Sequence, residues 1–167
     1  MAITISTSFG DITIRTFDDK APQTVKNFLA YCKSGFYEGT IFSRVMPGFM
    51  IQCGGYTEDL DLKPTRENIE NEAHNGLKNF RGTVAMARTN DPHSANAQFF
   101  INCADNDFLN FTGESVTGWG YCVFAEVIQG MEVVDRIAKV QTQTKGNFQN
   151  VPVDAVTIEK VTVGEKS

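Results

Sequence analysis

The sequence predicts a mainly β protein: a closed eight-stranded antiparallel β-barrel capped by two α-helices. About eight short segments alternate or cluster apolar residues as strands do, and loops join most neighbouring segments. Only two segments have helical periodicity, and the absence of βαβ alternation argues against a doubly wound parallel sheet. Closing eight strands into a barrel removes exposed edges, and two amphipathic helices can cover the open ends.

The first two strands and the first helix are expected within the first 35 residues. Residues 1–17 alternate, which predicts a hairpin turning at residues 8–10 with one face formed by Ile3, Ile5, Ile12 and Ile14. The period then changes: residues 21–35 bury one helical stripe, made of Val25, Phe28, Leu29 and Cys32. Pro22 suits the first turn of this helix and Gly35 its end.

A second hairpin follows, with strands at 40–45 and 49–53 joined by Pro47-Gly48, a strong turn pair. Residues 54–80 are polar and irregular, and such a length indicates a functional or packed loop. The remaining elements are strands at 82–88, 97–102, 121–127 and 155–163, and a short helix at 130–140.

Composition limits the class of protein. A chain of 167 residues suits one domain, 1–167. The net charge of −5 without a basic run argues against nucleic-acid binding. No apolar stretch approaches the roughly 20 residues that span a bilayer, and the N-terminus lacks a secretory signal, so we expect a cytoplasmic protein without membrane contact. The four cysteines never form CxxC, which favours free buried thiols over disulfides or a metal site.

Common catalytic motifs are absent: there is no GxSxG, P-loop, HExxH or strand-linked GxGxxG. What stands out is Arg44 and Gln52 within apolar strands, where a guanidinium is costly unless something specific offsets it. Alternation puts Met50 on one face with Gln52, and Phe100 on one face with Gln98. Exposed Met and Phe side chains beside Arg and Gln indicate an apolar pocket with a few aimed polar groups.

The stretch FSRVMPGFMIQCGG at 42–55 resembles the cyclophilin signature, F-H-R-V/I followed by F-M-x-Q-G-G. The stretch MARTNDPHSANAQFFIN at 86–102 is similar to the family's M-A-x-x-x-x-P-x-S-x-x-x-Q-F-F-I, and DNDFLN and YCVFAEV match its later segments. The loop within FLNFTGESVTGWGYCVF is similar to the bacterial cytoplasmic cyclophilins. The resemblance covers essentially the whole chain in order.

This resemblance implies an eight-stranded barrel with two helices and a peptidyl-prolyl cis-trans isomerase, or rotamase, that needs no cofactor or metal. It makes Arg44 the catalytic residue. Gln52 would position Arg44 or the substrate. The side chains expected to wall the proline pocket are Phe49, Met50, Phe100 and Leu109. Those expected to hold the peptide backbone are Ala87, Arg88, Thr89 and Gln98.

Four positions depart from the family pattern. Ser43 replaces a histidine and is expected to point away from Arg44 along the strand, with activity retained. Cys53 replaces a glycine and would strain the backbone if that glycine needs a special angle. Phe108 aligns with the tryptophan of cyclosporin-sensitive members, so we expect cyclosporin to bind weakly at best. Tyr121 replaces a pocket histidine, and its hydroxyl could serve as the polar contact.

Two rival functions remain open. One is a binding module for proline-containing segments with little catalysis, supported by Ser43 and Cys53. The other is a chaperone-like folding helper whose apolar surface holds nascent chains. The expected partners are proline-containing peptides and unfolded or folding proteins, and a closed barrel of this size is expected to be a monomer. Redox regulation through Cys53 or Cys103 has no evident resolving partner.

Overall fold

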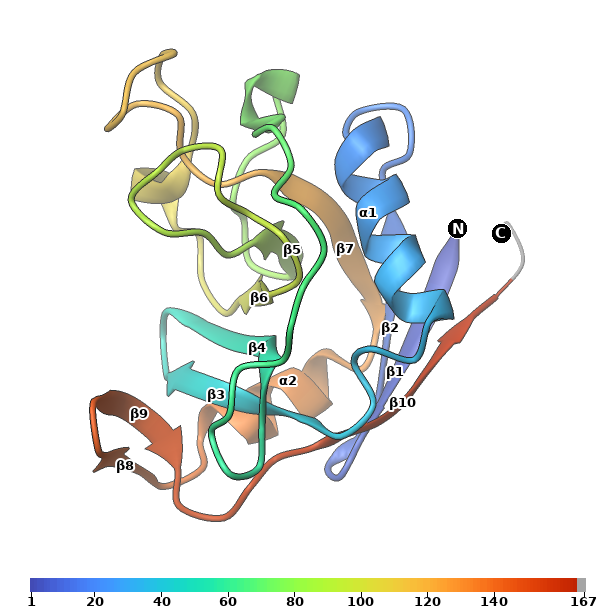
Figure 1. The fold of residues 1–167 in the computed structure, drawn as a ribbon, viewed down its shortest axis with the longest axis vertical. Helices are drawn as coiled ribbons and strands as arrows, with labels where there is room; N and C mark the ends of the chain where they lie inside the picture. Colours follow the sequence, from blue (N-terminus) through green and yellow to red (C-terminus); the bar gives the residue numbers. More distant parts are fainter. Residues whose placement is uncertain (165–167) are drawn as a thin grey trace.

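The computed structural model describes residues 1–164, so the last three residues of the expected 1–167 domain lie outside the described part. Eight antiparallel strands form one sheet in the order β10-β1-β2-β7-β5-β6-β4-β3 (Figure 1). In chain order these strands are β1 (Ala2–Thr7), β2 (Gly10–Thr16), β3 (Thr40–Met46), β4 (Met50–Thr57), β5 (Thr83–Met86), β6 (Phe99–Asn102), β7 (Val123–Gln129) and β10 (Ile158–Val163).

The sheet curls until its two outer strands nearly meet. A β-bridge joins Ile41 of β3 to Thr157, directly before β10, and the Phe42 N–H donates to the Val156 carbonyl at 2.9 Å. These contacts pair the ends of strands that would otherwise be open edges. The predicted eight-stranded antiparallel barrel is confirmed, as a nearly closed one.

The barrel interior is filled by one face of each strand. Ile3, Ile5, Ile12 and Ile14 are all at most 1% exposed, as their alternation predicted. An aromatic group lies at the centre, where the Phe28 ring packs 5.2 Å from Phe99 and 4.9 Å from Phe124. The Phe28–Phe99 pair is edge-to-face, a contact that is favourable beyond the area that it buries.

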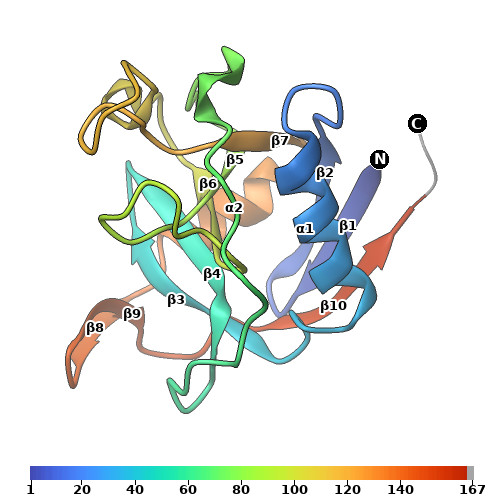
Figure 2. The ribbon, with the colours of Figure 1, turned by 45° about the horizontal axis from the view of Figure 1, so that its top comes forward.

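Two helices cover the curled sheet at different ends (Figure 2): α1 (Pro22–Lys33) and α2 (Met131–Ala138). Pro22 begins α1, where its missing N–H costs nothing. The short 3₁₀ turns η1 (Ala73–Asn75) and η2 (Asp107–Leu109) complete the helical segments. No helix within residues 1–164 is long and apolar enough to cross a bilayer.

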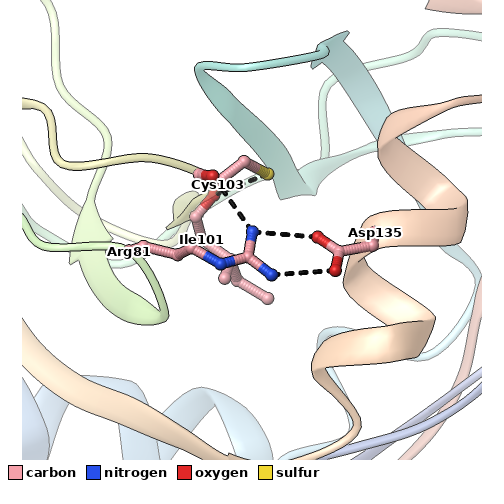
Figure 3. A network of polar contacts seen from close by, with 4 residues as sticks. All are labelled: Arg81, Ile101, Cys103 and Asp135. Carbon is pink, nitrogen blue, oxygen red and sulfur yellow. Dashed lines mark hydrogen bonds and ion pairs between the residues drawn. The ribbon is translucent and has the colours of Figure 1, made fainter.

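An ion pair fastens α2 to the strands beside it (Figure 3). The Arg81 guanidinium donates to both carboxylate oxygens of Asp135 in α2, at 3.0 and 2.8 Å, and to the Cys103 carbonyl at 3.1 Å. The hydrogen bond from Arg81 lowers the pKa of Asp135. Because a bidentate pair is geometrically specific, it contributes to the orientation of α2, although an exposed pair adds little to stability.

Two features differ from the sequence prediction. Strand β4 continues to Thr57, so the irregular stretch begins after residue 57 and not at residue 54 as predicted. A two-stranded hairpin, β8 (Thr142–Lys145) and β9 (Phe148–Pro152), was not predicted and lies alongside β3 (Figure 1). Its Gly146-Asn147 turn was a usable signal, but the flanking residues are too polar to show strand alternation.

The expected strain at Cys53 is not found. Cys53 is a fully buried strand residue that pairs with Phe42 and Phe99, and the positive φ of 92° falls on the next residue, Gly54. A Cβ at Gly54 would lie 2.8 Å from the buried Tyr37 ring, so Gly54 is the position in β4 where the backbone requires glycine.

All four cysteines are free and buried. Burial raises the pKa of Cys32 to about 12 and the pKa values of Cys103 and Cys122 to about 11, and it raises that of Cys53 well above the ordinary value. Since the thiolate is the reactive form, native thiols should react very slowly near pH 8.

We therefore expect Ellman's reagent to label four thiols in denaturant and essentially none within minutes in the native protein at pH 8. A single thiol that reacts within seconds without denaturant would contradict this assignment and reopen redox regulation.

Candidate active site

An apolar pocket with an estimated volume of about 70 Å³ opens on the outer face of β3, β4 and β6. Its lining contains every predicted site residue except Thr89, Gln98 and Phe108. The lining residues are Arg44, Phe49, Met50, Gln52, Ala87, Arg88, Phe100, Leu109 and Tyr121. The paired strands β3, β4 and β6 supply Arg44, Met50, Gln52 and Phe100, and the turns and loops beside them supply the other lining residues.

A β-bulge places Arg44 at the mouth of this pocket. Phe42 pairs with Cys53 and Arg44 pairs with Gln52, so Ser43 is an extra residue in β3. The bulge turns Ser43 and Arg44 to the same side, and both line a neighbouring groove. The expectation that Ser43 points away from Arg44 was therefore wrong, because regular alternation fails at a bulge.

The Arg44 side chain is exposed at the rim, so its charge is not buried in the apolar interior. Within residues 1–164 the ion pairs are Arg15–Glu126 and Arg81–Asp135, and Arg44 belongs to neither. Its guanidinium donors remain available to a ligand that enters the pocket.

Gln52 contacts a second glutamine rather than Arg44. Its Nε2 donates to Gln98 Oε1 at 3.2 Å, and among the described residues the Gln52 carbonyl and the Gln98 NH₂ group have no other hydrogen-bond partner. The Gln98 side chain lies flat over Gly55, where a Cβ would approach within 2.4 Å of Gln98 Cγ and Cδ. Glycine at 55 is therefore needed for this amide pair.

The floor and walls of the pocket are buried apolar side chains. Met50 and Phe100 are only 2% and 4% exposed, so the expectation of exposed Met and Phe side chains was wrong. They belong to a second hydrophobic cluster outside the barrel, together with Ala85, Leu109 and Val123. The pocket is a small opening in this cluster rather than a bare apolar patch.

Aromatic side chains form one wall of the pocket and part of its rim. Tyr121 packs edge-on against Phe100, with ring centroids 5.7 Å apart. Phe108 is 74% exposed and leans on Phe49 at 5.5 Å, so it extends the rim without lining the pocket itself. Phe108 thus presents an apolar face to solvent beside the pocket mouth.

The Arg88 side chain makes its contacts within the protein. Its Nε donates to the Gly120 carbonyl at 3.0 Å, and its guanidinium lies 4.4 Å from the Tyr121 ring centre. The N–H groups of Ala87 and Thr89 are also used, by Gln98 and Ser94. Among the described residues, the Arg88 backbone N–H and C=O make no hydrogen bond, so they can pair with a peptide.

Three buried asparagines support the segment that carries Phe108 and Leu109, and the sequence reading missed them. The Asn106 side chain donates to the Phe49 carbonyl and to Asn102, both at 2.8 Å. Asn102 donates to Asn79 at 3.0 Å, and Asn79 donates to the Leu109 carbonyl at 3.2 Å. A fully satisfied buried amide network of this kind rigidifies the wall of the pocket. Asn106 lies in DNDFLN, the signal that could have found it.

The side chains of the site can bind an apolar group of a ligand and polarise a polar group beside it. Within residues 1–164, no group of three His, Cys, Asp or Glu side chains is placed to hold a metal ion. The pocket lining combines an apolar well with one free cation, Arg44, and a neutral amide, Gln52. Such a site suits a small apolar ring whose attached amide lies at the mouth.

The chain matches a known protein family over nearly its whole length. Residues 2–163 match the family model described as cyclophilin type peptidyl-prolyl cis-trans isomerase/CLD. The chain is 64% identical over 163 residues to peptidyl-prolyl cis-trans isomerase B of Escherichia coli (strain K12), covering 98% of this chain and 99% of that one. It is 53% identical over 161 residues to a peptidyl-prolyl cis-trans isomerase of Acinetobacter baylyi, covering 96% and 84%.

A solved structure agrees in fold. The cyclophilin type peptidyl-prolyl cis-trans isomerase of Cryptosporidium parvum, crystallised in the presence of the dipeptide Ala-Pro, superposes with a TM-score of 0.81. Its sequence is 26% identical, and the match covers 99% of this chain and 100% of that chain.

Gly55→Ala tests the amide pair. The new Cβ must displace Gln98, so we expect the side-chain amide signals of Gln52 and Gln98 to shift in NMR spectra. Overpacking of this kind should lower the free energy of unfolding by about 1–3 kcal/mol.

The matched control is Gly113→Ala, because Gly113 has open space around its Cβ position. We expect that variant to change stability by less than about 0.5 kcal/mol. Unchanged glutamine signals in Gly55→Ala would show that the amide pair does not depend on this glycine.

Proposed function

Because the chain belongs to the cyclophilin type peptidyl-prolyl cis-trans isomerases and is an isomerase of X-Pro peptide bonds, we propose that Arg44 is its catalytic residue. In this proposal the Arg44 guanidinium donates a hydrogen bond to the prolyl nitrogen as the bond twists. The proline ring sits meanwhile in the apolar pocket beside it.

The reaction needs no bond to break. Resonance gives the X-Pro C–N bond partial double-bond character, and rotation must cross about 18–20 kcal/mol. Without catalysis the exchange takes tens to hundreds of seconds. Midway through rotation the resonance is lost and the prolyl nitrogen regains a lone pair. A donor aimed at this nitrogen therefore stabilises the transition state more than the planar ground state.

The observation that carries the proposal is the position of Arg44. It is the free cation at the mouth of a small, mainly apolar pocket, and no carboxylate competes for it among the described ion pairs. The apolar well also disfavours the charge-separated planar amide. Each tenfold of acceleration requires about 1.4 kcal/mol, so one well-aimed charged hydrogen bond can supply roughly 100-fold.

We assign the remaining residues by their place around the pocket. Phe49, Met50, Phe100 and Leu109 enclose the proline ring. The free backbone groups of Arg88, flanked by Ala87 and Thr89, pair with the peptide backbone. The Gln52–Gln98 pair offers a carbonyl and an NH₂ group to the same backbone. Phe108 and Tyr121 complete the rim.

Proline-containing segments of unfolded or folding proteins are the substrates that we propose, with the protein acting as a monomer in the cytoplasm. The relative from Cryptosporidium parvum was crystallised in the presence of Ala-Pro, which supports a proline-peptide ligand. Four free thiols suit a reducing compartment. A barrel with its edges paired offers little to a second copy by strand addition.

Arg44→Ala should lower kcat/KM for an Ala-Pro-Phe peptide by about 100-fold, since it removes a hydrogen bond made mainly in the transition state. A protease-coupled or NMR exchange assay measures the rate, and circular dichroism checks the fold.

The matched control is Arg66→Ala, because Arg66 is an exposed arginine outside the pocket lining. We expect that variant to keep full activity. Retained activity in Arg44→Ala would refute the assignment, and negligible activity in the unmodified protein would favour a proline-binding module.

Phe108 lacks the indole N–H of the tryptophan found at this position in cyclosporin-sensitive members, so cyclosporin should bind weakly. Phe108→Trp should strengthen cyclosporin binding about tenfold, the effect of one added hydrogen bond. Titration calorimetry measures the affinity, with Phe80→Trp as the control at another exposed phenylalanine. An equal affinity in the unmodified protein and Phe108→Trp would contradict the role of Phe108.

A further inference from the structure

A second groove, with an estimated volume of about 360 Å³, adjoins the proline pocket. Its far wall is formed by residues 147–150, which are the end of the hairpin turn and the first three residues of β9. The β8–β9 hairpin lies beside β3 in Figure 1. The barrel supplies the near wall. The near-wall residues are Ser43, Arg44, Gln52, Tyr56 and Gln98.

The groove is continuous with the pocket through shared residues. Arg44 and Gln52 line both, so a chain that leaves the pocket past these two side chains enters the groove. The bulge at Ser43 produces this arrangement, because it turns Ser43 and Arg44 to the groove side together.

The groove wall is rich in unused neutral hydrogen-bonding groups. Its amides come from Gln52, Gln98, Asn147, Gln149 and Asn150. Among the described residues, only Gln52 and Gln98 of this set make a side-chain hydrogen bond, and they make it with each other. An amide can both donate and accept, so these groups suit a polar peptide segment.

Charge in the groove has one sign. Arg44 is the only charged residue among the lining residues, and no carboxylate joins it. A lysine or arginine on the ligand would meet a like charge and find no carboxylate, whereas a neutral polar side chain could donate to and accept from the amides without that repulsion.

An aromatic contact with β4 holds the β8–β9 hairpin in place. Phe148 packs edge-on against Tyr56 of β4, with ring centroids 5.1 Å apart. Asn150 adopts φ 61°, a left-handed conformation that asparagine tolerates better than most residues. The anchored aromatic and the fixed local backbone keep residues 147–150 facing β3.

We propose that this groove binds the segment of the substrate that flanks the isomerised proline, and that it favours neutral hydrogen-bonding side chains over lysine and arginine. The β8–β9 hairpin is then a specificity determinant of the isomerase. The proposal rests on the function proposed above, because it requires the proline to occupy the Arg44 pocket.

The test uses octapeptides with a central Ala-Pro, varied between Gln and Lys at the second and third positions on either side of the proline. The decisive variant is Asn147→Ala/Gln149→Ala/Asn150→Gly, in which glycine keeps the positive φ of position 150. The matched control is Gln143→Ala, since Gln143 is an amide of the same hairpin that lines a different cavity.

We expect the unmodified protein and Gln143→Ala to prefer Gln over Lys on one flank by about two- to tenfold in kcat/KM, the effect of one net hydrogen bond. In the triple variant this ratio should fall below about twofold, while a short Ala-Ala-Pro-Phe peptide is isomerised at the unmodified rate.

An unchanged Gln-to-Lys ratio in the triple variant, or no preference on either flank, would overturn the proposal. These results leave the assignment of Arg44 intact, because that assignment fails only if Arg44→Ala still isomerises the short peptide. The two claims are therefore tested separately.

Discussion

The pairing of β4 with β3 on one side and β6 on the other is the constraint on which the site depends. It sets Gln52 opposite Arg44 and opposite Phe100, so the cation, the amide and the pocket wall meet on one face. Because strand side chains alternate, the other face of the same strands can fill the barrel. The bulge at Ser43 breaks that alternation beside the pocket, and it opens a second direction of approach to Arg44.

This arrangement separates stability from catalysis. The barrel core and the α1 aromatics bury the large side chains, whereas the chemistry uses groups at the rim that are exposed or half-buried. Arg44 therefore avoids the cost of burying a charge, and its donors stay free until a substrate arrives. Buried neighbours make the site rigid. The Asn79–Asn102–Asn106 network holds the loop that forms one pocket wall, and Gly55 leaves room for Gln98 to lie flat beside Gln52. The site is thus organised before the peptide binds, which is what stabilising a twisted amide requires.

Much of this could be predicted from sequence, and the failures have local physical reasons. The isoleucine alternation of β1 and β2 and the helical stripe of α1 follow simple periodic rules. The Pro47-Gly48 turn follows from the turn preference of these two residue types. The motif resemblance named every residue that lines the pocket. Regular alternation could not reveal the bulge at Ser43, because a bulge depends on the register with the partner strand, which the pattern within one strand does not show. Nor could it show that Met50 and Phe100 are covered, since their cover comes from Leu109 and Tyr121 in later loops. The β8–β9 hairpin was missed because most of its residues are polar and exposed, so the strands show no apolar alternation.

The central claim is that Arg44 acts on the rotating bond rather than on the resting peptide. NMR exchange spectroscopy on the bound Ala-Pro peptide tests this most directly, because it gives the forward and reverse rotation rates on the enzyme together with Kd. Loss of the guanidinium should slow both rotation rates by the same large factor and change Kd by less than about threefold, a ground-state effect under 1 kcal/mol. Unchanged rotation rates with a much weaker Kd would mean that Arg44 only binds the peptide, and that would contradict the account.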